Sequence, residues 1–188
     1  MLVARCWGSP LSTPDHLYMI GGISHALVTM TNCEKFDIQT NSWNNISSLN
    51  IAEIGITCLY FHPYQIFICG GYYKNTYETI SISPSNVNQK WTLLTVQNAT
   101  QRGYGIGYQY NEKEILLFGG EYSPSQFIIF DIQSSKLINK GIEFNSNLYN
   151  TSKGRMHDGK FKIINYSDKK LYQIDLNTFK FDSSPVDF

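Results

Sequence analysis

The chain has 188 residues, of which 42% are apolar and 14% aromatic, and its fifteen basic residues balance its fifteen acidic ones. This composition is typical of a packed globular domain or a single array of repeats, and it argues against an intrinsically disordered chain. The formal net charge of zero, with no long run of like charge, argues against a nucleic-acid or anionic-membrane partner. No apolar run is long enough to span a bilayer.

No CxxC pair, which would suggest a zinc site, occurs among the four cysteines Cys6, Cys33, Cys58 and Cys69. Arg5 and Gly8 interrupt the first ten residues before the core of a secretion signal could form. We therefore expect a reduced, cytoplasmic location. Cys58 and Cys69 are expected nearly opposite each other on paired strands, where two buried thiols are favoured over a disulfide.

Three similar apolar stretches each end in a glycine pair: HLYMIGG (16–22), QIFICGG (65–71) and EILLFGG (114–120). The first glycines, Gly21, Gly70 and Gly119, follow one another at intervals of 49 residues. A period of this length is typical of repeat architectures, including the blades of propellers. The chain therefore divides into four units, at about residues 1–51, 52–100, 101–145 and 146–188, within a single domain.

In the first unit, the glycine pair is followed by a polar loop and by the strand candidate FDIQTNSW (36–43), with Trp43 six positions after Asp37. In the second unit, the strand candidate GITCLYF (55–61) turns through residues 62–64 into the glycine strand. The second unit lacks the later Asp and has a longer turn before Trp91. Short strands broken by Pro, Gly, Asn and Asp predict antiparallel β structure throughout, and no stretch shows helical periodicity.

The third unit begins with GYGIGYQY (103–110), in which glycines alternate with larger residues, so that all three glycines face one way. On a strand close to the axis of a propeller, crowding would favour such small residues. Its later strand candidate, FDIQSSKL (130–137), places Leu137 six positions after Asp131. The fourth unit is degenerate: Ile164 and Asn165 stand where the glycines are expected, although Asp175 and Phe181 keep the later spacing.

This pattern resembles the kelch repeat, in which a glycine pair ends the second strand, a Tyr-Asp-like pair lies on the third and a Trp opens the fourth. The residues that carry the resemblance are Gly21-Gly22 with Phe36-Asp37 and Trp43, Gly70-Gly71 with Trp91, and Gly119-Gly120 with Phe130-Asp131. The resemblance spans the whole chain and is strongest in the first and third units. It implies a β-propeller in which each unit forms one four-stranded antiparallel blade, with Trp43, Trp91, Leu137 and Phe181 between blades.

Four blades are few for a kelch propeller, and an open array would leave two apolar blade faces uncovered. Three arrangements remain, in this order of preference: a segment of a longer propeller, self-association with another chain, and a closed four-blade ring. We expect an incomplete or open ring.

The resemblance also implies a function, because kelch domains commonly bind protein partners through loops on one propeller face. The loops after the three glycine pairs are the candidates. Exposed tyrosine is a frequent interface anchor, and the residues that we expect to bind the partner are Tyr72, Tyr73, Lys74, Tyr122, His25 and Arg102. An adaptor or scaffold role follows, with no nucleic-acid or membrane partner.

A catalytic role is not expected. The GYGIG run lies inside a strand and precedes another strand, whereas a phosphate loop needs a following helix. The histidines His16, His25, His62 and His157 are distributed over different strands and turns, so we expect no metal site and no other cofactor. No Ser-His-Asp order or close carboxylate pair stands out. The alternative is a segment of a kelch-type enzyme, galactose-oxidase-like or carbohydrate-active, without its active site.

Overall fold

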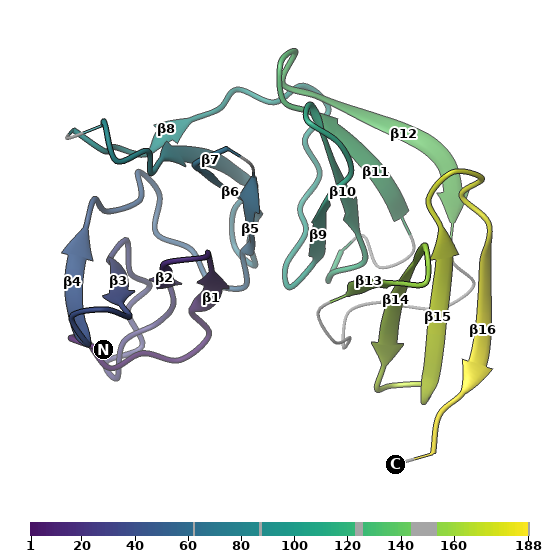
Figure 1. Cartoon of the computed structure of the whole chain (residues 1–188), viewed down its shortest axis with the longest axis horizontal. Helices are drawn as coiled ribbons and strands as arrows, with labels where there is room; N and C mark the ends of the chain where they lie inside the picture. The colour runs from purple at the N-terminus through teal and green to yellow at the C-terminus, as the bar shows by residue number, and fades with distance from the viewer. Residues whose placement is uncertain (62, 87, 123–125, 144–153, 188) are drawn as a thin grey trace.

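The structure of the protein, a computed structural model, describes residues 1–61, 63–86, 88–122, 126–143 and 154–187. Over these residues the chain forms sixteen β-strands and no helix, and the strands make four antiparallel sheets of four strands each (Figure 1). The predicted all-β fold of four four-stranded units is therefore confirmed. The described part of the chain accordingly contains no helix of the length and apolarity needed to cross a membrane.

Within each sheet, neighbouring strands are consecutive in the chain. The first sheet contains β1 (Ser9–Ser12), β2 (His16–Ile20), β3 (Cys33–Asp37) and β4 (Ser42–Ile46). The second contains β5 (Thr57–Phe61), β6 (Gln65–Gly70), β7 (Thr76–Ser81) and β8 (Thr92–Leu93). The third contains β9 (Ile106–Gln109), β10 (Glu114–Phe118), β11 (Gln126–Asp131) and β12 (Lys136–Glu143). The fourth contains β13 (Arg155–His157), β14 (Lys160–Asn165), β15 (Lys170–Asp175) and β16 (Phe181–Pro185).

The four sheets follow one another along an open arc, with the first and fourth sheets at its two ends (Figure 1). The first strand of each sheet lies nearest the inside of the arc: β5 contacts β1 on one side and β9 on the other. Among the described residues, no such contact joins β1 to β13. The array is thus open, as expected for an incomplete ring.

An apolar cluster fills the space between each pair of neighbouring sheets. The cluster between the first and second sheets is built from Tyr18, Ile20, Cys33, Leu49, Ile56, Ile66, Ile68, Ile80 and Trp91. The second and third sheets share Leu59, Phe61, Phe67, Cys69, Tyr77, Ile115, Leu117 and Phe130. The third and fourth share Ile106, Leu116, Phe118, Phe127, Ile129, Phe161, Ile163, Tyr172, Ile174 and Leu176. Each fully buried aliphatic or aromatic side chain stabilises the fold by roughly 1.5–3 kcal/mol, so these clusters hold the sheets together.

The large residues predicted between blades occupy those clusters, with one exception. Trp91 is buried between the first and second sheets, and Leu137 and Phe181 pack against the next two clusters. Trp43 instead lies on the opposite face of the first sheet, half-buried beside Phe36, with 5.3 Å between the ring centroids. The exception arises because no sheet precedes the first one in the structure.

The glycine pairs bring neighbouring sheets into backbone contact. Gly70 and Gly71 have φ values of 76° and 129°, which side-chain-bearing residues rarely adopt. A Cβ atom on Gly70 would lie 2.2 Å from the Arg102 carbonyl oxygen, and one on Gly71 would lie 2.1 Å from the Glu53 side chain. The Gly71 N–H donates to the Arg102 carbonyl at 3.2 Å. The pair therefore combines a special backbone conformation with a close approach.

The fourth sheet shows where the sequence register was wrong by one residue. Asp131 pairs with Glu114, five positions before the first glycine of the third pair. Asp175 pairs with Lys160, so the same count places Asn165 and Tyr166 in the position of the glycines. Ile163 and Ile164 are adjacent in β14, so the sequence alone does not show which of them faces the third sheet.

Cys58 and Cys69 lie on opposite faces of the second sheet. Cys58 pairs with Ile68, whereas Cys69 pairs with Thr57, so the two thiols are one position out of register. They are therefore not opposite each other and form no disulfide; Cys69 is buried, whereas Cys58 is half-buried.

Replacing Gly70 by Ala is expected to destabilise the protein by about 3 kcal/mol, because the left-handed backbone and the clash with the Arg102 carbonyl both add cost. Gly159 is the matched control, because it has a φ of 71° and a Cβ added there would have no atom within 4 Å. Gly159→Ala should cost only about 1 kcal/mol, the conformational part alone. Urea unfolding of both variants measures the difference, and equal costs would contradict the close approach.

Stability should fall at alkaline pH because buried acids are held neutral. Burial raises the pKa of the Cys69 thiol from 9.0 to about 12 and that of Cys33 to about 11. The folded protein thus retains these protons longer than the unfolded chain, so their contribution is fully present below about pH 9 and is lost as the pH rises toward the folded values. Urea midpoints measured from pH 8 to pH 11 should decline, and Cys69→Ala should decline less steeply than the wild type; an identical slope would be evidence against this account.

Candidate functional site

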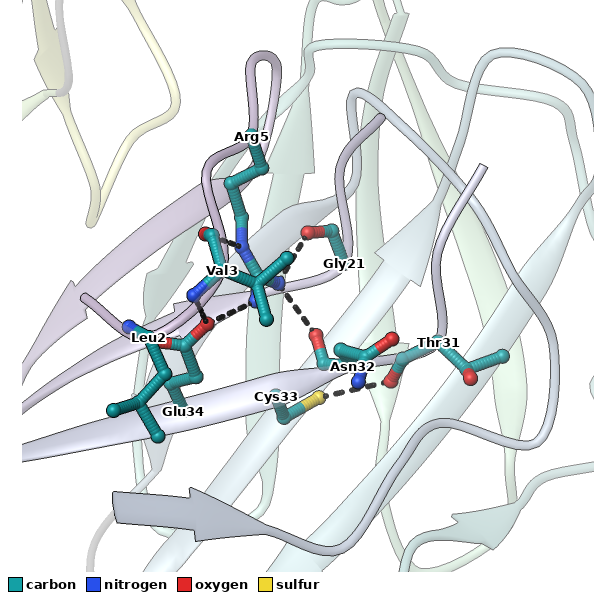
Figure 2. Close-up of polar contacts among 8 residues, drawn as sticks. All are labelled: Leu2, Val3, Arg5, Gly21, Thr31, Asn32, Cys33 and Glu34. Carbon is teal, nitrogen blue, oxygen red and sulfur yellow. Dashed lines mark hydrogen bonds and ion pairs between the residues drawn. The ribbon is translucent and has the colours of Figure 1, made fainter. Parts of the chain in front are cut away.

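The side chain of Arg5, which precedes β1 in the chain, is buried in the first sheet. Arg5 donates to the carbonyl oxygens of Gly21 and Asn32 at 2.8 and 2.7 Å and forms an ion pair with Glu34 (Figure 2). The two side chains of the ion pair are 1% and 0% exposed. Charge-assisted hydrogen bonds that satisfy a buried pair keep its geometry rigid, so Arg5 fixes the end of the glycine strand.

Glu53 and Arg102 stand at the corresponding positions of the second and third sheets. In each of the three cases, the residue two positions later has a positive φ: 52° at Trp7, 64° at Gly55 and 57° at Tyr104. We call Arg5, Glu53 and Arg102 the hub residues. Arg102 donates to the Gly119 carbonyl, as Arg5 does to its own glycine strand.

Glu53 differs from the other two hub residues because its side chain accepts hydrogen bonds instead of donating them. It is fully buried and accepts the backbone N–H groups of Tyr73, at 3.0 Å, and Lys74, at 2.5 Å. It also accepts the N–H of Ile54 at 2.9 Å. The carboxylate of Glu53 thus holds the loop that follows the second glycine pair.

Four tyrosines from the second and third sheets form one cluster around Tyr72. The centroid of its ring is 5.0 Å from that of Tyr73, edge to face, 5.9 Å from Tyr122 and 6.3 Å from Tyr104. Tyr72 is half-buried, whereas Tyr73 is 59%, Tyr122 is 55% and Tyr104 is 37% exposed. We call these four residues the tyrosine cluster. Aromatic pairs with such centroid distances attract one another while leaving outer faces free.

Backbone hydrogen bonds hold the segments that carry the cluster. The N–H of Tyr72 donates to the Ile54 carbonyl at 2.9 Å, and the N–H of Tyr104 donates to the Gly55 carbonyl at 2.6 Å. The side chain of Gln101 donates to the Tyr72 carbonyl at 2.6 Å. These contacts pre-organise the cluster, which reduces the entropy lost when a surface binds.

The cluster lies next to a carboxylate, Glu121. The pKa of Tyr104 is raised, first by partial burial and then by the charge of Glu121. The pKa of Tyr122 is also raised, by loss of solvent and by a side-chain hydrogen bond with Tyr72. The phenol groups of Tyr104 and Tyr122 can serve as hydrogen-bond donors and acceptors.

The structure brings together three of the six residues predicted to bind a partner, Tyr72, Tyr73 and Tyr122. Lys74 is exposed beside them on the loop held by Glu53. His25 is exposed on the loop between β2 and β3, in a different sheet, next to Leu27 and Val28 at 77% and 60% exposure. Arg102 is 1% exposed and directed at the Gly119 carbonyl, so it supports the site from inside. Part of the loop that follows the third glycine pair, residues 123–125, lies outside the described residues.

Sequence reasoning missed three residues of this region, Tyr104, Trp7 and Glu53. Tyr104 was hidden because the alternation of GYGIG predicts a regular strand, whereas its φ of 57° turns the chain there. Trp7, 57% exposed, occupies the corresponding position in the first sheet. Aligning the chain on Arg5 and Arg102 would have placed Glu53 beside them, and that is the signal in the sequence that could have revealed it.

A groove of about 840 Å³ runs along the inside of the arc, lined mainly by β1, β5 and β9. Gly105 and Gly107 lie in its wall, where an added Cβ would come within 2.8 Å of Arg102 and 2.6 Å of Leu59. The predicted crowding on the innermost strand is therefore found at these two glycines. Tyr104 and Trp7 also line the groove, at the same end as the tyrosine cluster.

Among the described residues, no group of three or more His, Cys, Asp or Glu side chains could hold a metal ion. His16 lies 3.8 Å from Asp37, and His157 lies 2.6 Å from Asp158 in an exposed turn. His62, which the sequence places in the turn between β5 and β6, lies outside the described residues.

Four antiparallel four-stranded sheets set side by side along an arc, with their first strands innermost, define a β-propeller architecture. Residues 8–50, which contain the whole first sheet and the first glycine pair, match the family model of the Kelch motif. The first sheet therefore carries a Kelch motif, as the resemblance drawn from the glycine pairs predicts, and the four four-stranded sheets are consistent with a kelch-type propeller. Kelch repeats are typically protein-interaction modules.

Glu53→Gln should loosen the loop that carries Tyr73 and Lys74, because an amide cannot accept as many N–H groups as a carboxylate. We expect the free energy of unfolding to fall by about 2 kcal/mol and the amides of residues 73 and 74 to exchange with solvent roughly tenfold faster. Hydrogen exchange followed by mass spectrometry measures this effect. Glu121→Gln is the control, since it removes a neighbouring carboxylate that does not bond to the loop; equal exchange in both variants would refute the assigned role of Glu53.

Proposed function

We propose that this protein is a non-catalytic interaction module that binds a protein partner through the loops at one end of its sheets, with the tyrosine cluster at the centre of the contact. The match to the Kelch motif supports the general class of function. The position of the four tyrosines supports the choice of surface.

The observation that carries the proposal is an exposed aromatic group on a fixed backbone. Tyrosine provides apolar contact area and a hydroxyl group while losing little side-chain entropy, so it is enriched among residues that dominate binding energy. Tyr73 and Tyr122 expose more than half of their surface even though they pack against Tyr72. A cluster that spans two sheets also gives a partner a continuous surface rather than one loop tip.

Lys74 belongs to the proposed surface because its backbone is fixed by Glu53 and its side chain is exposed. His25, with Leu27 and Val28, would form an outlying contact on the first sheet. Arg102 has no place on this surface, since its guanidinium is buried. An adaptor or scaffold role in the cytoplasm is part of the proposal, and cysteines that form no disulfide agree with a reducing compartment.

Two alanine substitutions test the proposed surface directly. Tyr73→Ala and Tyr122→Ala remove exposed rings and should each weaken partner capture roughly tenfold or more, as expected for anchor residues at an interface. Tyr64→Ala is the matched control, because Tyr64 is 50% exposed in the turn at the other end of the sheet.

The measurement is quantitative affinity capture from a native lysate, with the bound proteins identified and compared among the three variants and the wild type. A partner whose recovery falls in the first two variants and is unchanged in the control agrees with the proposal. Recovery that is unaffected by both substitutions, or reduced equally by the control, would place the contact elsewhere.

A further inference from the structure

Each sheet has a face toward the sheet before it, which we call its leading face, and one toward the sheet after it, its trailing face. In the second and third sheets the leading face is fully covered. The residues that form it there are Ile66, Ile68, Ile80, Ile115, Leu117 and Phe130, none more than 1% exposed. This face is therefore built to lie against another sheet.

The first sheet has the same apolar leading face without a cover. By strand register, Leu17, Met19 and Phe36 take the places of Ile66, Ile68 and Ile80, since Leu17 pairs with Phe36 as Ile66 pairs with Ile80. Leu17 is 41% exposed, and Met19, Phe36 and the adjoining Trp43 are only half-buried. Four large apolar side chains on one sheet face are more than the scattered exposure typical of a surface.

The segments that lead into the first and second sheets show the same contrast in burial. Glu78 accepts the backbone N–H groups of the two residues after Leu49, and Glu34 does the same for the two residues after Met1 (Figure 2). Met1 therefore occupies the place of Leu49. Leu49 is 4% exposed between two sheets, whereas Met1 is 48% exposed.

The chain's own trailing face is a poor match for this face. On the fourth sheet, the row formed by Lys162, Gln173 and Asp182 is polar, where the third sheet has Leu116 and Ile129 in the first two places. The next row of the same face keeps two apolar residues, Ile164 and Leu171. Asp182 lies 3.9 Å from Lys160 in an exposed ion pair. Packing this row against Leu17 and its neighbours would strip water from charged groups without compensation, so a head-to-tail contact between copies is disfavoured.

The leading face of the first sheet is by contrast compatible with a second copy of itself. Among the residues of β1 to β4 on this face, Glu34 carries the charge, and its side chain is buried in the ion pair with Arg5. Two such faces therefore meet without opposing like charges. A two-fold contact is also closed, so it cannot extend into a filament.

We propose that Leu17, Met19, Phe36 and Trp43 form the contact surface of a symmetric dimer of this chain, first sheet against first sheet. The pairing buries both apolar leading faces in the middle of an eight-sheet assembly and leaves the two trailing faces, with their charged Lys162 and Asp182, at its outer ends. The surface is separate from the tyrosine cluster, so each can fail without the other.

Light scattering after size exclusion, over about 1 µM to about 200 µM protein, tests the proposal. The wild type should shift from monomer to dimer mass over this range, and Leu17→Glu should stay monomeric at every concentration. Leu93→Glu is the matched control: Leu93 is 50% exposed on β8 of the second sheet, and its variant should dimerise like the wild type.

Circular dichroism and urea unfolding of Leu17→Glu establish that the variant is folded, which is expected because the side chain is already partly in solvent. A wild type that remains monomeric at the highest concentration overturns the proposal and assigns the face to a different polypeptide. Open-ended oligomers also overturn it, because they require a head-to-tail contact. A dimer that persists in Leu17→Glu would place the interface elsewhere.

Discussion

The contact between a glycine pair and the hub residue of the next sheet, made by the first two pairs, is the constraint on which the structure depends. The Gly22 N–H donates to the Glu53 carbonyl and the Gly71 N–H to the Arg102 carbonyl, both at 3.2 Å. Such an approach leaves no room for a side chain at the glycine. One contact therefore sets the separation of two sheets, and its repetition at a fixed interval sets the arc. The apolar clusters then fill a space whose size the backbone has already determined.

Much of this arrangement could be predicted from the sequence, because the fold repeats and the repeats share a register. The 49-residue interval, the Asp spacing and the large residues after it predict four sheets and their order. The register of the fourth sheet could not be predicted, since Asn165 and Tyr166 occupy the positions at which a glycine pair marks the register of the other sheets. The repeat pattern also does not show whether a sheet lies beside the first sheet. Trp43 was therefore expected between sheets, whereas the structure leaves it half-buried at the end of the arc.

The candidate site could be predicted only in part, because it consists of departures from the repeat. Exposed tyrosines after a glycine pair are visible in the sequence, and Tyr72, Tyr73 and Tyr122 were found in this way. The convergence of Tyr104 with them depends on a left-handed φ in a segment that looks like regular strand. Glu53 was missed for a related reason: a carboxylate stands where the neighbouring repeats have arginine, and it bonds to loop N–H groups instead of glycine carbonyls. The exchange of donor for acceptor lets the second sheet hold the loop after its glycine pair through a carboxylate.

The two ends of the array differ for a reason that follows from the same geometry. An internal sheet must be apolar on both faces, since both are covered. At the fourth sheet one trailing row has become Lys162, Gln173 and Asp182, so charged groups stand there beside the apolar Ile164 and Leu171. At the first sheet the apolar residues are retained, and Glu34 still holds the incoming chain as Glu78 does inside the array. A sheet that keeps the side chains and the hydrogen bonds of an internal one is equipped to be covered, and in this respect the first sheet differs from the fourth, whose outer face carries charged groups.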